Sequence, residues 1–133
     1  MTECDEKRLR TFEMKIYRRL LGITWREKTN EFVKNKIRNI CGFEPEGVVE
    51  MVKKRKFQYF GHIIRGGGTA KAVMEGVMEG RRGRGRPQTN WMKNLNEWSG
   101  MRPMELSKMT VNRNGWRKAV KDWVHPQLNQ LRR

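Results

Sequence analysis

Apolar side chains recur at intervals of three and four residues through the first half of the chain, the spacing that places them on one face of an α-helix. The pattern predicts helices over about 5–21, from residue 29 or 30 to 41, and over about 45–65. Gly22 and Gly42 follow the first two, where glycine can adopt the left-handed conformation that ends a helix. The apolar positions that define these helices are Leu9, Phe12, Ile16 and Leu20, then Val33, Ile37 and Ile40, then Val49, Val52, Phe60 and Ile63.

The second half of the chain predicts shorter helices bounded by glycine, proline and capping residues. A helical turn at about 70–74 is expected after the glycines at 66–68, and a helix from residue 89 or 90 should end at Gly100. Pro103 and Asn112 are expected to begin two more helices, because proline suits a first turn and asparagine can accept a hydrogen bond from its N–H groups. The fold class predicted is all-α.

Tryptophans at helical spacing in this second half indicate a core and not a base-stacking surface. Trp25 lies in a connection between two predicted helices and is expected to pack at their corner, with stacking on a base as the alternative. The residues predicted to form the structural core are Phe12, Ile16, Phe60, Trp91, Trp98, Trp116 and Trp123.

Residues 79–87 interrupt the helical pattern with the sequence Glu-Gly-Arg-Arg-Gly-Arg-Gly-Arg-Pro. Glycine and proline disfavour a helix here, and the planar arginine guanidinium groups fit phosphate oxygens. We therefore predict an extended contact strip, with a basic flexible linker as the alternative. The strip divides the chain into a basic helical region (1–65), a Gly/Arg-rich hinge and strip (66–88) and a Trp-rich helical region (89–133), which together could form one domain.

Charge supports a polyanionic partner. The 133 residues include 30 Lys and Arg against 14 Asp and Glu, a net charge of +16, and residues 53–86 hold ten of the cations but only two glutamates. Residues 53–56 are four consecutive cations that resemble a nuclear-import signal and could equally bind a phosphate backbone, although a solvated face is the simpler alternative. The residues predicted to contact RNA or DNA are Lys53, Lys54, Arg55, Lys56, Arg65, Arg81, Arg82, Arg84 and Arg86.

Catalytic, metal and cofactor sites are not predicted. Asp5 and Asp122 are the only aspartates and lie at opposite ends, whereas a two-metal polymerase or nuclease needs clustered carboxylates. The cysteines and histidines lack the paired spacing of zinc sites, and His62 is expected to be a structural helix residue. No run approaches the roughly 18 apolar residues of a membrane span, and two distant cysteines fit a reducing compartment. We expect an intracellular, nuclear protein.

Several stretches in order resemble one family. They are residues 12–25 (FEMKIYRRLLGITW), Thr29-Asn30-Glu31, residues 55–62 (RKFQYFGH), residues 78–87, Trp91 with Trp98, and Arg113 with Trp116-Arg117. This series, over about residues 8–120, resembles the region downstream of the polymerase domain in non-LTR (LINE-type) retrotransposon endonuclease–reverse transcriptases. The resemblance departs at Asn112, where similar elements often have an acidic residue, and at Gly115.

The resemblance implies a parent polyprotein that nicks DNA and copies its RNA into the nick. The carboxylates of its RNA-directed DNA polymerase and endonuclease would lie upstream, so this chain is expected to be a non-catalytic nucleic-acid-binding segment, a truncated copy. RNA or DNA and the upstream polymerase domain are the implied partners. Two alternatives remain open. Arg84-Gly85-Arg86-Pro87 matches the core of an AT-hook, which binds the minor groove of A·T-rich DNA, and the basic helix 45–65 resembles a calmodulin-type target.

Overall fold

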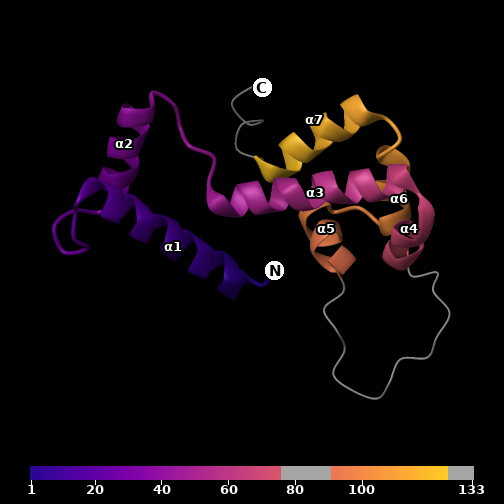
Figure 1. Cartoon of the computed structure of the whole chain (residues 1–133), viewed down its shortest axis with the longest axis horizontal. Coiled ribbons are helices and arrows are strands. Elements are labelled where there is room, and N and C mark those ends of the chain that lie inside the picture. Colours follow the sequence, from indigo (N-terminus) through magenta and orange to yellow (C-terminus); the bar gives the residue numbers. More distant parts are fainter. Residues whose placement is uncertain (76–90, 126–133) are drawn as a thin grey trace, which may run out of the picture. The chain divides into compact units, whose positions relative to one another are not determined.

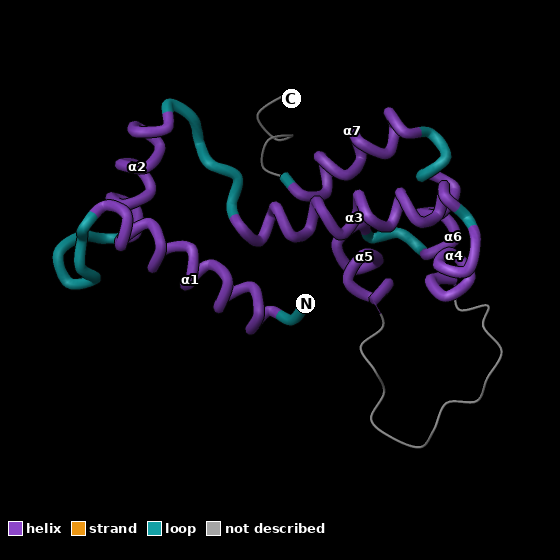
Figure 2. Tube along the Cα trace, in the orientation of Figure 1, coloured by secondary structure: helices purple, strands orange, loops and turns teal. Residues whose placement is uncertain are grey.

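The computed structural model describes residues 1–75 and 91–125, and within these residues it contains seven helices and no strand. The all-α prediction is confirmed; Figure 2 shows only helices and their connections. The predicted contact strip at 79–87 lies outside the described residues. The helices (Figure 1) are α1 (Glu3–Leu21), α2 (Asn30–Cys41), α3 (Val48–Gly66), α4 (Gly68–Glu75), α5 (Trp91–Ser99), α6 (Pro103–Met109) and α7 (Arg113–Val124).

Most helix ends follow from local chemistry. The Thr29 side chain accepts a hydrogen bond from the Phe32 N–H at 3.3 Å, and the Asn112 side chain accepts one from the Gly115 N–H at 3.1 Å. Gly22 and Gly42 end α1 and α2 with φ angles of 64° and 73°, in the left-handed region. These four positions therefore act as the sequence predicted.

The third helix begins at Val48, three residues later than predicted from Pro45. Its first turn is capped from a distance, because the Glu13 carboxylate of α1 accepts a hydrogen bond from the Val48 N–H at 3.2 Å. A carboxylate at a helix N-terminus also interacts favourably with the helix dipole. This cap comes from 35 residues away, so local sequence signals could not locate it.

The chain divides into two compact units, Met1–Val52 and Lys53–Arg133, called here the N-terminal and the C-terminal unit. In the N-terminal unit, α1 packs against α2. The Tyr17 hydroxyl donates to the Glu13 carboxylate at 3.1 Å, and its burial, together with that carboxylate, raises the pKa of Tyr17. Glu13 and Tyr17 therefore lie on the packed face of α1.

Two core predictions are wrong in this unit, because Phe12 and Ile16 are 57% and 39% exposed. The face of α1 that packs is rotated by one residue from the predicted apolar stripe and contains the half-buried Glu13, Tyr17 and Leu21. Periodicity favoured the wrong face because two of these packed residues are polar and are satisfied by hydrogen bonds.

The C-terminal unit has an aromatic core around α3. Figure 1 shows α5 and α7 on either side of α3, and the Phe57 ring lies 6.1 Å from Trp98 of α5 and 6.0 Å from Trp116 of α7. Such edge-to-face pairs add to the gain from burying apolar area. The buried members of the core are Phe57, Phe60, Ile64, Met92, Leu95, Leu106, Trp116, Val120 and Val124.

The predicted core residues of this unit divide into two groups. Phe60 and Trp116 are 1% and 3% exposed, which confirms both. Trp91, Trp98 and Trp123 are half-buried and pack against the core. Residues 53–66 belong to the same unit as these tryptophans, so the division between the two units falls within α3, after Val52.

Candidate nucleic-acid interface

The four consecutive cations of α3 do not form one surface. Successive residues of a helix lie about 100° apart, so residues 53–56 point in different directions. Lys53 Nζ lies 5.3 Å from the centre of the Trp98 ring, and Lys56 Nζ lies 5.4 Å from the same ring centre. Arg55 is exposed and has no ion-pair partner among the described residues. Of the four, Arg55 is the cation best placed for an external phosphate.

Lys56 is held inside the C-terminal unit by α5. Its Nζ donates a hydrogen bond to Oδ1 of the buried Asn94 at 2.8 Å and lies 4.8 Å from the centre of the Trp91 ring. Burial lowers the pKa of Lys56 below its ordinary value. This predicted phosphate ligand therefore already has a polar partner and an aromatic one within the fold.

Arg65, another predicted phosphate ligand, connects α3 to the end of α6. Its Nη1 donates a hydrogen bond to the backbone carbonyl of Thr110 at 2.9 Å, and Thr110 is fully buried. A charged donor on a buried carbonyl is a structural contact. The remaining predicted contacts, Arg81, Arg82, Arg84 and Arg86, lie outside the described residues.

A basic face on α7 was not among the predicted contacts. Arg113, Arg117 and Lys121 recur every four residues, so they share one side of the helix over about 12 Å. Together with Lys118 they are exposed, and none pairs with a carboxylate of the described residues. The sequence analysis counted consecutive cations and therefore overlooked cations spaced along a helix, although the tryptophan pattern of this helix already indicated which side faces solvent.

The row of apolar side chains beside these cations anchors α7 in the core. Trp116, Val120 and Val124 are 3%, 4% and 6% exposed. The single acidic residue of α7, Asp122, is half-buried. This helix therefore presents its cations on a rigid element, with no carboxylate among its fully exposed residues.

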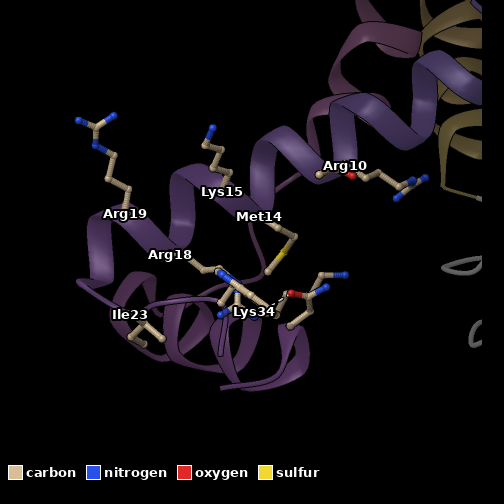
Figure 3. Close-up of a pocket in the computed structure, with 10 residues that line it drawn as sticks. Arg10, Met14, Lys15, Arg18, Arg19, Ile23 and Lys34 are labelled. Carbon is tan, nitrogen blue, oxygen red and sulfur yellow. Dashed lines mark hydrogen bonds between the residues drawn. The ribbon is translucent and has the colours of Figure 1, made fainter. Parts of the chain in front are cut away.

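A second basic region surrounds an open hollow of about 690 Å³ between α1 and α2 in the N-terminal unit (Figure 3). Figure 3 shows Met14 and Arg18 extending towards α2, while Lys15 and Arg19 extend outwards from α1. The lining residues are Arg10, Thr11, Met14, Lys15, Arg18, Arg19, Ile23, Trp25, Asn30 and Lys34.

Arg18 organises the connection between α1 and α2. Its Nη1 donates to the carbonyl of Thr24 at 2.9 Å, and its Nη2 donates to the carbonyl of Lys28 at 2.7 Å and to Asn30 Oδ1 at 2.9 Å. Trp25 does not pack at this corner as predicted, because it is 73% exposed. The guanidinium takes up the inner side of the connection, where the indole was expected.

Metal ligands are not grouped in residues 1–75 and 91–125, where no set of three or more His, Cys, Asp or Glu side chains could hold an ion. Cys4 and Cys41 are exposed free thiols, and His62 lies on the exposed side of α3. No helix of the described ranges is both long and apolar enough to span a membrane.

Comparisons of the chain with models of known protein families, with curated proteins and with solved structures found no match. The resemblance to retrotransposon reverse transcriptases therefore rests on the sequence motifs alone.

Proposed function

We propose that this chain binds nucleic acid without catalysing a reaction, and that it is a C-terminal segment of a non-LTR retrotransposon reverse transcriptase. The observation that carries the binding proposal is the basic face of α7, whose three cations, like the neighbouring Lys118, have no described carboxylate partner. The net charge of +16 also favours a polyanionic partner for the chain as a whole. The motif series carries the assignment to the retrotransposon family.

Phosphate is the chemistry that such a face recognises best. Cations that lack an internal partner can neutralise phosphates and release condensed counterions, which provides most of the sequence-independent affinity for nucleic acid. A face about 12 Å long reaches roughly three or four phosphates along one strand of a duplex, given a rise of about 3.4 Å per phosphate. Arg55 and the arginines at 81–86 would add further contacts.

A salt titration of binding tests this function. Affinities of the full chain are measured for duplex DNA, single-stranded RNA and structured RNA between 50 and 300 mM NaCl. With about five to eight phosphates neutralised, the log–log slope on duplex is expected to be roughly −4 to −7. Tight binding with a slope near zero, or no binding to any of the three, would contradict the proposal.

Matched charge variants locate the contacts. The variant R117Q/K118Q/K121Q removes three exposed cations of α7, and K7Q/R8Q/K36Q removes three exposed cations of the N-terminal unit that do not line its hollow. The first should flatten the slope by up to about three units, at about one unit per lost contact, and the second by much less. Equal effects would mean that only the total charge matters.

An AT-hook-like chromatin binder is the second candidate, favoured by Arg84-Gly85-Arg86-Pro87. It would prefer A·T-rich duplex over structured RNA in the same titration, and R84A/R86A would remove that preference. The calmodulin-type candidate is less favoured by packing. The apolar face of residues 57–64 is buried in the core, so capture of this helix would require the C-terminal unit to open.

A further inference from the structure

We infer that the connection between α1 and α2 is a stacking site for the bases of single-stranded nucleic acid, with Trp25 as its platform. We call residues 22–34 the α1–α2 corner. The inference rests on the proposed function and adds the form of nucleic acid and the element that selects it.

Exposure separates Trp25 from the other tryptophans. Its side chain is 73% exposed, whereas Trp116 is 3% exposed and the remaining three are half-buried against the core of the C-terminal unit. An exposed indole keeps a large apolar surface in water, and covering that surface with the face of a base is favourable. Trp25 is therefore the tryptophan available to an external base.

The corner is ordered before any ligand arrives. The Arg18 guanidinium donates hydrogen bonds to three oxygen atoms of the corner, on Thr24, Lys28 and Asn30, at 2.7–2.9 Å. Trp25 follows the first of these directly, so its backbone is fixed on a closed loop. A pre-ordered platform loses less conformational entropy on binding than a mobile one. Arg18 is thus a positioning residue for Trp25.

Cations and aromatic rings alternate along the corner. The Arg26 guanidinium lies 5.0 Å from the centre of the Trp25 ring, and Lys28 Nζ lies 5.1 Å from the centre of the Phe32 ring, which is 41% exposed. Lys34 lines the adjacent hollow. Rings that stack bases, next to cations that contact the backbone, are the combination that single-strand-binding proteins use.

The chemistry favours a single strand over a duplex. Internal base pairs of a duplex keep their faces stacked on each other, whereas unpaired bases can leave the stack and lie on an indole. The hollow beside Trp25, about 690 Å³, is within the size range of ligand pockets and has room for a nucleotide. Glu27 and Glu31 also belong to the corner, and they reduce its attraction for the closely spaced phosphates of a duplex.

Equilibrium binding by the full chain tests the inference, with a labelled 12-nucleotide single-stranded RNA and a 12-base-pair duplex at one salt concentration. Trp25→Ala should weaken single-strand binding by roughly 5- to 150-fold, equivalent to about 1–3 kcal/mol, and duplex binding by less than twofold. Trp25→Phe should retain most of the affinity. The matched control is Phe43→Ala, which removes an aromatic side chain of similar exposure (66%) from the next connection, and it should change neither affinity.

Fluorescence and a positioning variant add independent readouts. The exposed Trp25 should emit at the long-wavelength edge of the tryptophan fluorescence spectrum. Single-stranded RNA should quench that part of the spectrum in the wild type, and it should cause no such quenching in Trp25→Phe. Arg18→Lys keeps the charge but loses the forked contacts, and it should weaken single-strand binding while the duplex salt slope stays unchanged.

The outcomes separate this inference from the proposed function. If Trp25→Ala binds the single strand like the wild type while salt-dependent binding persists, the stacking site is wrong and the nucleic-acid function stands. If the wild type binds neither probe, both fail. An equal loss on both probes would also overturn the stacking site, because it would assign Trp25 a role that does not depend on unpaired bases.

Discussion

Lys56 of α3 is a cation with one polar and two aromatic partners on α5. Trp91, Asn94 and Trp98 of that helix contact its ammonium group. The hydrogen bond to Asn94 and the two aromatic faces offset part of the desolvation of the charge, but burial still lowers the pKa of Lys56. The Lys56 side chain therefore packs and donates its hydrogen bond within the fold, although it belongs to a run of cations that suggests phosphate binding.

This environment predicts a pH dependence of stability. Between the lowered folded-state pKa and about 10.5, the unfolded chain holds the Lys56 proton that the folded chain has released, so this lysine makes stability rise with pH in that window. Lys56→Met keeps the apolar stem and removes the titration. The difference in unfolding free energy between wild type and variant, measured by urea titration from pH 7 to 10.5, should move in favour of the wild type as pH rises. A constant difference would show that the ammonium group is effectively solvated.

At neutral pH the same variant loses the hydrogen bond to a buried amide oxygen and should be about 1–3 kcal/mol less stable. Lys54→Met is the control, since it removes one charge from the same helix and keeps an unbranched apolar side chain. Its free energy of unfolding is measured over the same pH range and compared with that of Lys56→Met.

At the scale of elements, α3 and α7 approach closely at Gly61. A Cβ atom at this position would lie 2.5 Å from Trp116 Nε1, too close for two non-bonded atoms. The indole N–H itself is buried without a hydrogen-bond partner in the described part of the chain. Gly61 is therefore present in the middle of a helix because the indole takes the space that a side chain would occupy.

Gly61→Ala should destabilise the C-terminal unit by about 1–3 kcal/mol, because overpacking displaces the indole and outweighs the better helix propensity of alanine. Gly66→Ala is the matched control in the same helix. A Cβ there meets nothing within 4 Å, so that variant should be neutral or up to about 1 kcal/mol more stable. Thermal unfolding followed by circular dichroism compares the two. Equal stability of both variants would mean that the interface between α3 and α7 adjusts without cost.

Helices and their ends were predictable because their causes are local. Thr29, Asn112 and the glycines at 22 and 42 act through bonds and dihedral angles within a few residues. The packed face of α1 and the start of α3 were not predictable. Both depend on Glu13, whose carboxylate reaches Val48 in another helix and makes a polar position part of the packed face.

The basic character of the candidate site was predicted from the sequence, but its location on the fold was not. Net charge is a property of composition, so a basic contact surface followed directly from the sequence. Which cations remain available depends on tertiary contacts, and these assign Lys56 and Arg65 to the fold. The α7 face and the exposed Trp25 needed the structure, because their availability depends on what packs behind them.

At the scale of the whole molecule, a net charge of +16 acts on folding and on binding in opposite senses. Unpaired cations repel one another in the folded chain, so the folded state is less stable at low ionic strength. Ion pairs such as Arg10–Glu50, with 2.9 Å between nitrogen and oxygen, act the other way, but exposed pairs contribute only about 0–1 kcal/mol each. Repulsion should therefore dominate the effect of salt on stability.

We expect the Tm of the free chain to rise by roughly 3–8 °C between 0.05 and 0.5 M NaCl, which corresponds to about 1 kcal/mol at this size. Over the same range the Debye length falls from about 14 Å to about 4 Å, so interactions between neighbouring helices are screened. Affinity for nucleic acid should fall over that range. The variant R117Q/K118Q/K121Q removes part of the repulsion, so its Tm should be higher in low salt and should rise less with added salt. A Tm that falls with salt would show that attractive ion pairs, and not the unpaired cations, dominate the electrostatics of the folded state.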